Sequence, residues 1–534
     1  MPRSADGGLG RHAPVGGPGG QSPLGLREAE ALALKQVGRY EEAATAFAHL
    51  ARQQPKSHGP LYNLGNTYLA ANRPAEAIEP FRRAIRLAPR FAHAHNNLGL
   101  ALLATGEAAL AAASFARAAG LDANNPAPRH LAGHALLRAG RPAEALPHLV
   151  EANRMAPHQA AIVTDLADAL RRTGALRDVA PLAREAAALA PDRIEAWNNL
   201  ANALRDVGDF TGAAAASEQA LRLAPDHGEA HYNLALTLLA DGRFVEAWPH
   251  WEYRWQGVVG AAPRFAMPPW DGAPLGEGLL YLHAEQGFGD TIQFCRYVPL
   301  AARRARVVLA VQTPLLRLLR ELPGPAEIVD LNEPPPRFAA QAPLLSLPRA
   351  FATGAATIPA EVPYIPVNEP ARQAWSARLA ALPGCKVGLV WAGNPDFPFD
   401  HARSIAADQL APLAQVAGAS FVSLQPGAAA RPPFPLVDWT AELSDFADTA
   451  ALVAALDLVI GVDTAVIHLA GALARPVWLL NRFAGDWRWG AAGRDSVWYP
   501  SLTQFRQADP GAWLPVIAAV CAALQQFVAN TRRI

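Results

Sequence analysis

Prolines recur at a step of 34 residues through the first half of the chain. They close successive units, with Ala123 in the one vacant slot, at Pro55, Pro89, Pro157, Pro191 and Pro225. Because proline does not continue a helix, each step ends one unit of helical structure. A period of this length predicts pairs of antiparallel helices stacked into a solenoid, since one pair cannot bury its apolar face alone.

The second unit shows how each pair packs. Apolar and small residues fall at helical spacing on both predicted helices, at Leu61, Leu64, Gly65 and Tyr68, then Ala77, Phe81 and Ala84. Small residues let the helices approach, and large ones fill the gaps. This period and pattern are typical of the tetratricopeptide repeat. We therefore predict an all-α tetratricopeptide solenoid of about seven units over residues 24–257.

Asparagine recurs at one position of the first helix in four of the units. These residues are Asn63, Asn97, Asn199 and Asn233. A side-chain amide both donates and accepts hydrogen bonds, so amides in one register suit the backbone of an extended peptide. We expect them to bind a protein or peptide partner. The alternative is that they are solvated polar positions.

Charge and cysteine content narrow the classes of function. Lys+Arg and Asp+Glu number 47 each, so no global basic field attracts nucleic acid. The three cysteines show no Cys-x-x-Cys spacing, which argues against zinc and a disulfide framework. Residues 1–23 are rich in Gly and Pro without a signal-peptide core, and no apolar run is long enough to span a bilayer. We expect a disordered start, a cytoplasmic location, no transmembrane segment and no nucleic-acid partner.

The pattern changes after the last repeat. Residues 247–255 contain more aromatic side chains than a repeat interior holds, so we expect them to dock the next domain. A proline-containing linker follows at residues 258–275. Beyond it, strand-like and helix-like segments alternate. This alternation predicts two α/β lobes, residues 276–370 and 371–534, each with a parallel sheet and helices on both faces, and a cleft between them.

The segment at residues 455–478 is predicted to form strand, turn, helix and strand. Leu458–Val462 suits a buried strand, Asp463 and Thr464 can cap the next helix, and His468 lies one turn after Thr464 on the same face. Free N–H groups and the helix dipole favour an anion such as phosphate at this edge of a parallel sheet. The alternative is a plain cap with His468 packed on the sheet.

The loop Glu285–Asp290 follows a predicted strand and opens a helix, as in a dinucleotide-binding fold. Gly287 and Gly289 match the first two glycines of that fingerprint, but Ile292 occupies the third position. The sequence contains no P-loop, nucleophile elbow, metal-binding His pair or Asp-x-Asp pair. We therefore expect no cofactor and no metal site.

Several motifs after the repeats resemble one protein family. In order, they are Trp-Glu-Tyr-Arg-Trp, Glu-Gln-Gly-x-Gly-Asp-Thr-Ile-Gln-Phe, Gly-Leu-Val-Trp-Ala-Gly-Asn, Arg-Ser-Ile, Ser-Leu-Gln, Asp-Phe-Ala-Asp-Thr-Ala and Val-Asp-Thr-Ala-Val-x-His-Leu-Ala-Gly-Ala-Leu. Nearly the whole chain resembles a bacterial tetratricopeptide-repeat glycosyltransferase-like family. The α/β half is more distantly similar to the heptosyltransferases of lipopolysaccharide synthesis, and the layout resembles O-linked N-acetylglucosamine transferase.

The resemblance implies a GT-B fold of two Rossmann-like lobes, with a nucleotide-sugar donor on the second lobe and the acceptor on the first. Heptosyltransferases face the donor diphosphate with an Asp-Thr/Ser-Gly turn and a following His. The expected donor-binding residues are thus Asp463, Thr464, Ala465, which replaces the usual glycine, and His468, together with Arg403, Ser404 and Gln425 from neighbouring loops. Arg403 stands where those enzymes usually have a lysine.

The resemblance also implies a catalytic base. Heptosyltransferases carry an aspartate after glycine in the loop of the first lobe, proposed as their base, and Asp290 matches it. Transfer of a sugar to a hydroxyl needs such a group near the acceptor oxygen. We expect Asp290 to be catalytic, with Glu285 as the second candidate. The alternative is that Asp290 only caps a helix that begins at Thr291.

Two functions are compatible with these patterns. One is a metal-independent glycosyltransferase that uses the solenoid to present a protein or peptide hydroxyl to a nucleotide sugar. The other is a binding scaffold whose α/β half has lost turnover. The polar residues kept in the predicted loops favour the enzyme. An aromatic cluster follows the predicted donor turn and comprises Trp487, Trp489, Trp498 and Tyr499. These rings could stack on a base or sugar, or they could form a core between the lobes.

Overall fold

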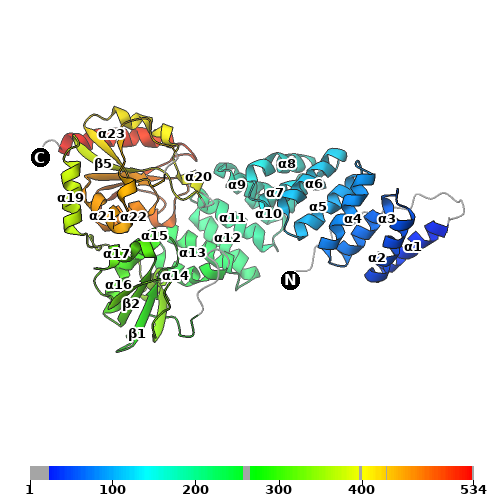
Figure 1. Cartoon of the computed structure of the whole chain (residues 1–534), viewed down its shortest axis with the longest axis horizontal. Helices are drawn as coiled ribbons and strands as arrows, with labels where there is room; N and C mark the ends of the chain where they lie inside the picture. The colour runs from blue at the N-terminus through cyan, green and yellow to red at the C-terminus, as the bar shows by residue number, and fades with distance from the viewer. Residues whose placement is uncertain (1–22, 257–264, 396–399, 428–429, 532–534) are drawn as a thin grey trace. The chain divides into compact units, whose positions relative to one another are not determined.

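The computed structural model describes residues 23–256, 265–395, 400–427 and 430–531 (Figure 1). The chain divides into two compact units, Met1–Ala169 and Leu170–Ile534. Nearly all of the predicted disordered start, and residues 258–264 of the predicted linker, lie outside the described residues. The division falls inside the solenoid, so the last repeats belong to the same compact unit as the α/β region. The domain bounds expected from the sequence stay a prediction.

The first unit is helical throughout its described residues, as predicted. Helices α1–α8 form four pairs, and α9 crosses into the second unit. The bounds are α1 Pro23–Gln36, α2 Tyr40–Gln53, α3 Gly59–Ala70, α4 Pro74–Leu87, α5 Ala92–Ala104, α6 Ala108–Leu121, α7 Pro126–Arg138, α8 Pro142–Met155 and α9 Ala160–Arg172.

Small and large residues face each other inside each pair. A Cβ atom at Gly65 would lie 2.6 Å from Phe81 Cε1, and one at Gly133 would lie 2.5 Å from Leu149 Cγ. Phe81 and Leu149 are fully buried. The glycines therefore let the two helices approach, and the large side chains fill the space, as the sequence pattern predicts.

A left-handed turn joins the two helices of every repeat. Its φ is positive at the same slot in all seven pairs, at Gly38, Asn72, Gly106, Gly140, Gly174, Gly208 and Gly242. Only glycine, and less readily asparagine, adopts this conformation at low cost. These turns give the repeat a second marker besides the terminal prolines.

The second unit begins with the remaining helices of the solenoid. Their bounds are α10 Leu176–Leu189, α11 Ile194–Asp206, α12 Phe210–Leu223, α13 Gly228–Ala240, α14 Phe244–Trp251 and the 3-10 helix η1 Glu252–Gln256. The aromatic end of α14 docks on the α/β region, as expected. Trp248 Nε1 donates to the main-chain oxygen of Thr353 over 2.7 Å, and the rings of Trp248 and Trp251 contact Trp487 edge-on.

The first α/β lobe contains a four-stranded parallel sheet in the order β3-β2-β1-β4. Its strands are β1 Leu279–His283, β2 Arg306–Val311, β3 Glu327–Asp330 and β4 Ala340–Pro343. One face packs into the main core. The other face is covered by Phe265 and Phe338 from extended segments, so helices do not cover both faces of this sheet as predicted.

The helices of the first lobe are shorter than the sequence predicts. The expected helix from Thr291 to Arg303 is divided into α15 Phe288–Phe294, η2 Cys295–Tyr297 and α16 Val298–Ala302. Pro299 lacks the N–H that a continuous helix would use, so a new helix begins just before it. Further short elements are η3 Thr313–Leu315, α17 Leu316–Leu319, η4 Leu344–Ser346, α18 Leu347–Ala350 and η5 Ala355–Thr357.

The second lobe contains a six-stranded parallel sheet in the order β10-β9-β8-β5-β6-β7. The strands are β5 Cys385–Val390, β6 Ala419–Ser423, β7 Leu436–Val437, β8 Leu458–Val462, β9 Val477–Asn481 and β10 Leu502–Arg506. In β8, Leu458 and Ile460 pack into one core and Val459 into another, so the sheet is buried on both faces.

Helices cover both faces of this second sheet. They are α19 Glu369–Leu379, α20 Asp400–Arg403, α21 Phe446–Ala455, α22 Ala465–Ala472 and α23 Trp513–Thr531, with η7 Thr440–Glu442 and η8 Trp487–Trp489. The helix expected at Asp408–Val416 is instead the 3-10 helix η6, Ala407–Gln415, which contains Pro412.

Helix α23 is the one helix of the described residues that is long and apolar enough to cross a bilayer. Its apolar stripe packs against the second sheet through residues that include Val516, Val520 and Leu524. The predicted absence of a long apolar run therefore needs one correction, since this segment has the required length and composition. One face of α23 is buried on the sheet, but only 28% of its apolar window is buried.

Candidate functional site

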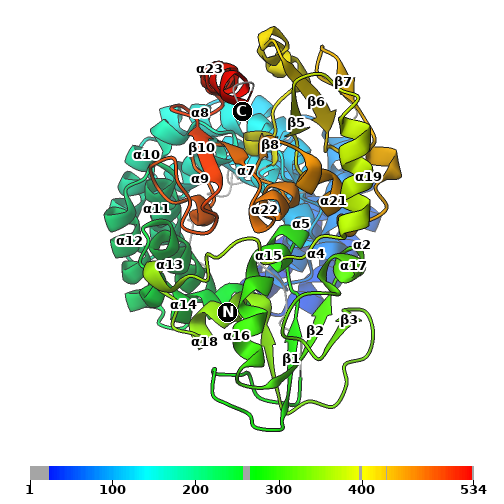
Figure 2. The same ribbon diagram turned by 90° about the vertical axis from the view of Figure 1, so that its left-hand side faces the viewer.

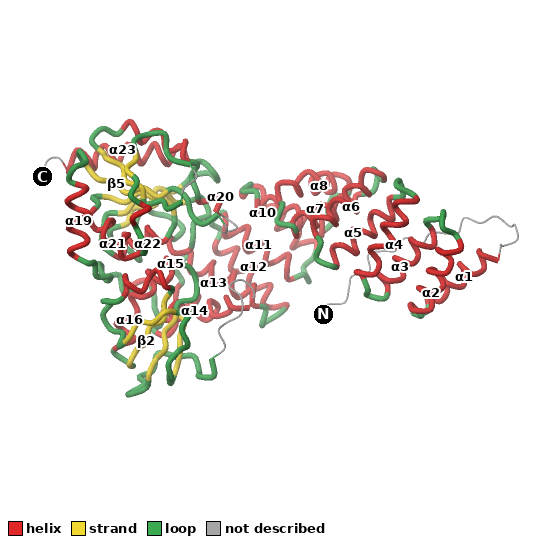
Figure 3. The backbone as a smooth tube through the Cα atoms, viewed as in Figure 1, coloured by secondary structure: helices red, strands yellow, loops and turns green. Residues whose placement is uncertain are grey.

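The carboxyl ends of the central strands of the second sheet gather most of the predicted donor-binding residues. Asp463 and Thr464 follow β8, the Ala392–Asn394 segment follows β5, and Gln425 follows β6. Because parallel strands end at one edge, these loops lie at the same edge of the sheet, whose strands are yellow around the β5 label in Figure 3. The arrangement is the one expected for a ligand site of an α/β sheet.

The turn after β8 presents the start of α22. Thr464 is the N-cap residue, with extended backbone at φ −144° and ψ 168°, but its side chain makes no capping hydrogen bond. Its Oγ1 is buried and has no partner among the described residues. Buried hydroxyls are normally bonded, so this group is a donor that the described chain leaves unsatisfied. The N–H groups of Ile467 and His468 bond to the main-chain oxygen of Thr464, whereas the earliest N–H groups of a helix have no partner within it.

Arg403 and Ser404 support this turn. Arg403 donates from Nη1 to the main-chain oxygen of Asp463 over 3.1 Å and from Nε to Asp400 over 2.8 Å. Ser404 donates to Asp400 and accepts from the N–H of Gly393, over 2.7 and 2.9 Å. A Cβ at Gly393 would lie 2.4 Å from the Arg403 guanidinium carbon, so glycine makes room for it.

Gln425 holds the end of β5. Its Oε1 accepts from the N–H groups of Trp391 and Ala392 over 3.1 and 2.8 Å. The Gln425 oxygen therefore fixes the loop that carries Gly393, and only its amide nitrogen is left to face a ligand. The structure brings Gln425, Arg403 and Asp463 to one edge, as predicted, while their contact with a donor stays a prediction.

His468 is buried against aromatic rings. Its Nδ1 lies 2.9 Å from the Tyr499 hydroxyl, its ring stacks on Trp489, and its Nε2 lies 3.8 Å from Asp463 Oδ1. Burial, with a further contribution from the Arg488 charge, lowers the pKa of His468 to about 3. His468 is therefore neutral, and with 6% of its side chain exposed it supports the turn from behind.

Asp290 lies in the first turn of α15, at the third helical position, and not before a helix that begins at Thr291. Its Oδ2 accepts the N–H of Gly287 over 3.0 Å, so it does cap the helix, by reaching back to the N-cap residue. Burial raises the pKa of Asp290, although the Arg488 charge opposes that shift. A carboxylate with a raised pKa is a better proton acceptor, so capping and catalysis are compatible here.

Helices α15 and α22 lie side by side in both views of the chain (Figures 1 and 2). A Cβ at Gly289 would lie 2.8 Å from His468 Cδ2 and 3.4 Å from Ala465 Cα. Gly289, which the sequence suggested as a dinucleotide glycine, therefore serves close helix packing. This contact brings the loop of the first lobe against the Asp463 turn of the second.

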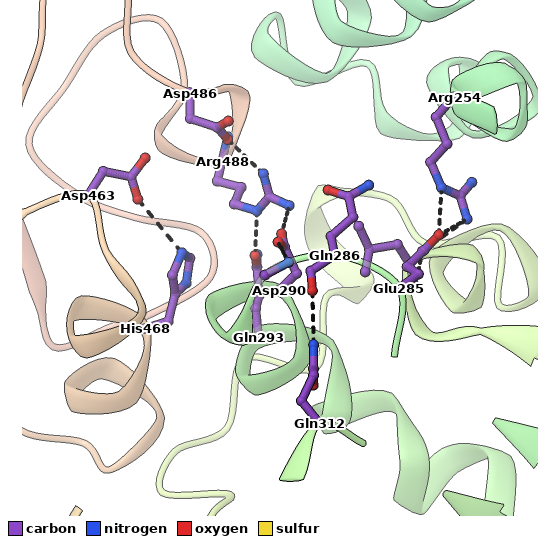
Figure 4. A network of polar contacts seen from close by, with 12 residues as sticks. Arg254, Glu285, Gln286, Asp290, Gln293, Gln312, Asp463, His468, Asp486 and Arg488 are labelled. Carbon is purple, nitrogen blue, oxygen red and sulfur yellow. Dashed lines mark hydrogen bonds and ion pairs between the residues drawn. The ribbon is translucent and has the colours of Figure 1, made fainter. Parts of the chain in front are cut away.

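Arg488 connects the two lobes through a polar network (Figure 4). It donates to Asp290 from Nη2, to Asp486 from Nη1 over 2.9 Å, and to Gln293 from Nε over 2.6 Å. Its own burial opposes the charge, but Asp486 and Asp290 raise the pKa of Arg488 above its ordinary value. Arg488 therefore holds Asp290 in place with a permanent positive charge.

Glu285 forms a separate ion pair with Arg254 of η1. Arg254 Nη2 lies 2.9 Å from Glu285 Oε2, and both side chains have no exposed surface. Ser346 and the N–H of Leu345 complete the network. Burial raises the pKa of Glu285 to about 7, although Arg254 opposes that shift. The enclosed pair supports a structural role for Glu285, and its catalytic role stays a prediction.

The aromatic cluster is a core between the lobes. Trp487, Trp489, Trp498 and Tyr499 are all at most 5% exposed. Trp498 meets Phe294 of α15 edge-on, and Arg296 lies over the rings of Trp498 and Tyr499. Of the two interpretations left open by the sequence, the structure favours packing over exposed stacking on a base or sugar.

The asparagine positions are used as bridges between repeats in the first unit. Asn97 donates to Asn66 over 2.6 Å and to Tyr62 over 3.2 Å, and Asn63 donates to Glu28. Asp165 occupies the same register and accepts from His130 and His134. In the second unit Asn199 is half-buried, and Asn233 is buried with an unpartnered Nδ2. Peptide binding by these residues stays a prediction.

Some residues of the site escaped the sequence interpretation. Arg488, Asp486 and Arg254 were not singled out, although each lies in an aromatic-rich segment where a charge needs a partner. A charged residue among aromatic residues is the sequence feature that could have indicated these positions. Among the described residues, no group of three or more His, Cys, Asp or Glu is placed to hold a metal ion.

Comparison with known proteins agrees with this division of the chain. Four windows match the tetratricopeptide repeat, at residues 28–90, 62–126, 130–194 and 198–263. Residues 441–492 match glycosyltransferase family 9 (heptosyltransferase). The matched segment runs from η7 through β8, α22 and β9 to η8, so it contains the Asp463 turn, His468, Asp486 and Arg488.

One curated relative is similar to about half of the chain. Protein FlbA of Caulobacter vibrioides is 31% identical over an alignment of 328 residues, and the match covers 55% of this chain and 54% of that protein. The chain therefore spans about half the length of this relative.

Solved structures also resemble the repeats. YrrB, described as a tetratricopeptide protein with an unusual peptide-binding site, is 20% identical and covers 35% of this chain and 96% of that chain, with a TM-score of 0.32. The Pseudomonas aeruginosa pilF protein is also 20% identical, and the match covers 39% of this chain and 94% of that protein, with a TM-score of 0.33.

Proposed function

We propose that the protein is a glycosyltransferase that moves a sugar from a nucleotide-sugar donor to a hydroxyl of a protein acceptor. The observation that carries the proposal is the Thr464 turn, with its buried unpartnered hydroxyl and the free N–H groups of α22. It lies in the segment that matches glycosyltransferase family 9. A helix N-terminus at the edge of a parallel sheet favours a phosphate, which supports a diphosphate at this place.

The roles of the other residues follow from their contacts. Arg403 and Ser404 fix the turn, Gln425 fixes the neighbouring loop, and His468 supports α22 as a neutral ring. Asp290, held by Arg488, is the base for the acceptor hydroxyl in a GT-B arrangement of the lobes. A metal is not needed in this scheme, because backbone N–H groups and the guanidinium of Arg403 oppose the donor's negative charge.

Thr464→Val tests the donor site. Valine keeps the shape and removes the hydroxyl, so binding of uridine, adenosine, guanosine or cytidine diphosphate should weaken about tenfold. The melting temperature should not fall, because the hydroxyl has no partner to lose. Calorimetry in the presence of a chelator measures this. Ser420→Ala is the control, since Ser420 lies at the opposite end of β6 and bonds to Pro383.

The result also separates the enzyme from a scaffold. The close packing of α15 on α22 at Gly289 favours a scaffold, because it places the first lobe against the start of α22. If no nucleotide diphosphate binds the wild-type chain, with or without magnesium, the enzyme proposal is wrong and the scaffold is left.

A further inference from the structure

The last repeats contain buried polar groups that have no hydrogen-bond partner among the described residues. They belong to the first helices of two successive repeats, α11 and α13, and are Asn198 Oδ1, Arg205 Nη1 and Asn233 Nδ2. Asn198 and Asn233 hold the register of Tyr62 and Asn97, which bond to each other in the first unit. Buried polar groups are normally satisfied, so this set indicates a ligand from outside the chain.

Arg205 is also short of a counter-charge. Its Nη2 donates to Asn202 over 2.8 Å, which is a neutral partner. The nearby Arg171 is paired with Asp206 over 2.6 Å, so Asp206 is already engaged. Burial is the main cause that lowers the pKa of Arg205; the charge of Asp206 opposes this shift, and the charges of Arg171 and Arg482 add to it. A guanidinium in such surroundings favours an anionic partner.

Arg482 adds a second positive charge. It directly follows β9, at the same sheet edge as the Asp463 turn, and is half-buried. Arg482 makes no hydrogen bond or ion pair within the described parts of the chain. The charge of Arg482 reaches Arg205 on the repeat helix, and neither arginine forms an ion pair with a carboxylate among the described residues, although the charge of Arg482 also reaches Asp486.

Tyr232 connects this pair of arginines with the candidate base. Tyr232 lies on α13, and its ring is 5.6 Å from that of Trp251. Burial raises its pKa, and the charges of Asp486, Arg488, Arg205 and Asp290 all reach it. Helix α13 also contacts η8, which carries Arg488. Helix α13 also contacts α11, which carries Arg205, so an anion held by Arg205 would lie on the repeats that pack against the Arg488 segment.

We propose that Arg205 and Arg482 bind a carboxylate side chain of the acceptor protein, close to the hydroxyl that receives the sugar. A guanidinium matches a carboxylate with two parallel N–H bonds, and Asn198 and Asn233 hold the adjoining peptide backbone. Arg205 is only half-buried as a whole, so a turn of its guanidinium brings Nη1 to the ligand. The inference rests on the proposed function in that the bound segment is the acceptor.

The acceptor is a better ligand here than the donor. Arg205, Asn198 and Asn233 all lie on repeat helices, whereas the segment that matches glycosyltransferase family 9 begins at residue 441. The buried amides also suit a peptide backbone, which both donates and accepts. The specificity that follows is for serine or threonine near aspartate or glutamate.

A position-scanned library of serine- and threonine-containing peptides tests this specificity. Glu, Gln or Lys is exchanged at each position, and binding to the full chain is measured by fluorescence polarisation without a donor. Glu should bind about ten- to a hundredfold more tightly than Gln at one position. Arg205→Met and Arg482→Met should each abolish that ratio. Arg222→Met is the control, because Arg222 is exposed on α12 and bonds only to Gln219.

Three experimental outcomes would overturn the proposal. The first is a wild-type chain with no preference for Glu over Gln, and the second is a preference that persists when Arg205→Met and Arg482→Met are combined. The third is weaker nucleotide binding by Arg205→Met with an unchanged peptide preference, which would assign Arg205 to the donor. Failure of the proposed function can be distinguished from failure of this inference. Thr464→Val should weaken nucleotide binding and leave the preference for Glu intact, so each proposal is tested by its own measurement. Arg205→Met should also keep the melting temperature, because it removes a buried charge that lacks a partner.

Discussion

Asp290 uses each of its two carboxylate oxygens for a different purpose. One oxygen caps α15 and the other accepts from Arg488, and 20% of the side chain is still exposed. The exposed part leaves lone pairs free for an acceptor proton. Replacing Asp290 therefore removes the proposed base and a charge partner together, and an informative experiment has to separate them.

Asp290→Asn should lower kcat by about two orders of magnitude or more, because asparagine caps the helix but is not a base. Arg488→Gln is the matched variant, since it breaks the same ion pair and keeps the carboxylate. Single-turnover transfer to an acceptor is the measurement. An equal loss of kcat in both variants would show that the ion pair, and not the base, accounts for the effect.

His134 and Asp165 give the first unit a dependence on pH. The hydrogen bond with Asp165 raises the pKa of His134 above 6.5, and bonds from both histidines lower that of Asp165 below 3.8 although burial opposes this. The His134 contribution to stability is present below pH 6.5 and is lost as the pH rises through the folded value. The Asp165 contribution is present above pH 3.8 and is lost as the pH falls through its folded value.

The wild-type melting temperature should therefore fall between about pH 6 and pH 8 relative to that of Asp165→Asn, which cannot form the charged pair. Thermal unfolding across this range, followed by circular dichroism, measures the difference between the two proteins. His95→Gln is the control, because His95 bonds only to a main-chain oxygen. Parallel curves for wild type and Asp165→Asn would contradict the assignment.

At the scale of elements, the repeat pattern depends on backbone conformation as much as on packing. Gly106 has φ +86° in open space, whereas Gly120 is an exposed helical residue of α6, also in open space. Gly106→Ala should cost about 1–2 kcal/mol, because alanine is strained at positive φ. Gly120→Ala should stabilise by up to about 1 kcal/mol. Urea unfolding measures both, and a loss from each would contradict the explanation.

Features that depend on nearby residues were predictable from the sequence, and features that depend on tertiary packing were not. The helix pairs and strands such as Leu458–Val462 were predictable, because periodicity and apolar runs decide them. Strand β4 was not, since Ala340–Pro343 is short and lies in a proline-rich interval. The Asp463 turn was predictable from one segment. The Asp290–Arg488 pair was not, because its members are separated by 198 positions and pair only through tertiary packing.

Across the second unit, the Arg254–Glu285 pair joins the end of the solenoid to the first lobe. Neither side chain touches solvent, so removing one partner leaves a buried charge. Arg254→Met or Glu285→Leu alone should destabilise by about 3–5 kcal/mol, and the double variant by much less. Chemical unfolding of the three variants forms a double-mutant cycle. Additive losses would mean that the two residues act independently.

The left-handed turns also make the number of repeats an adjustable quantity. The slot recurs every 34 residues from Gly38 to Gly242, and each helix of the first unit packs mainly on its neighbours in sequence. Excising residues 92–125 would remove α5 and α6 and leave every remaining turn in phase. Since the first unit ends at Ala169, such a deletion spares the Thr464 turn and Arg205. Gene duplication or deletion can thus change the number of repeats in whole steps while the residues of the second unit are inherited unchanged.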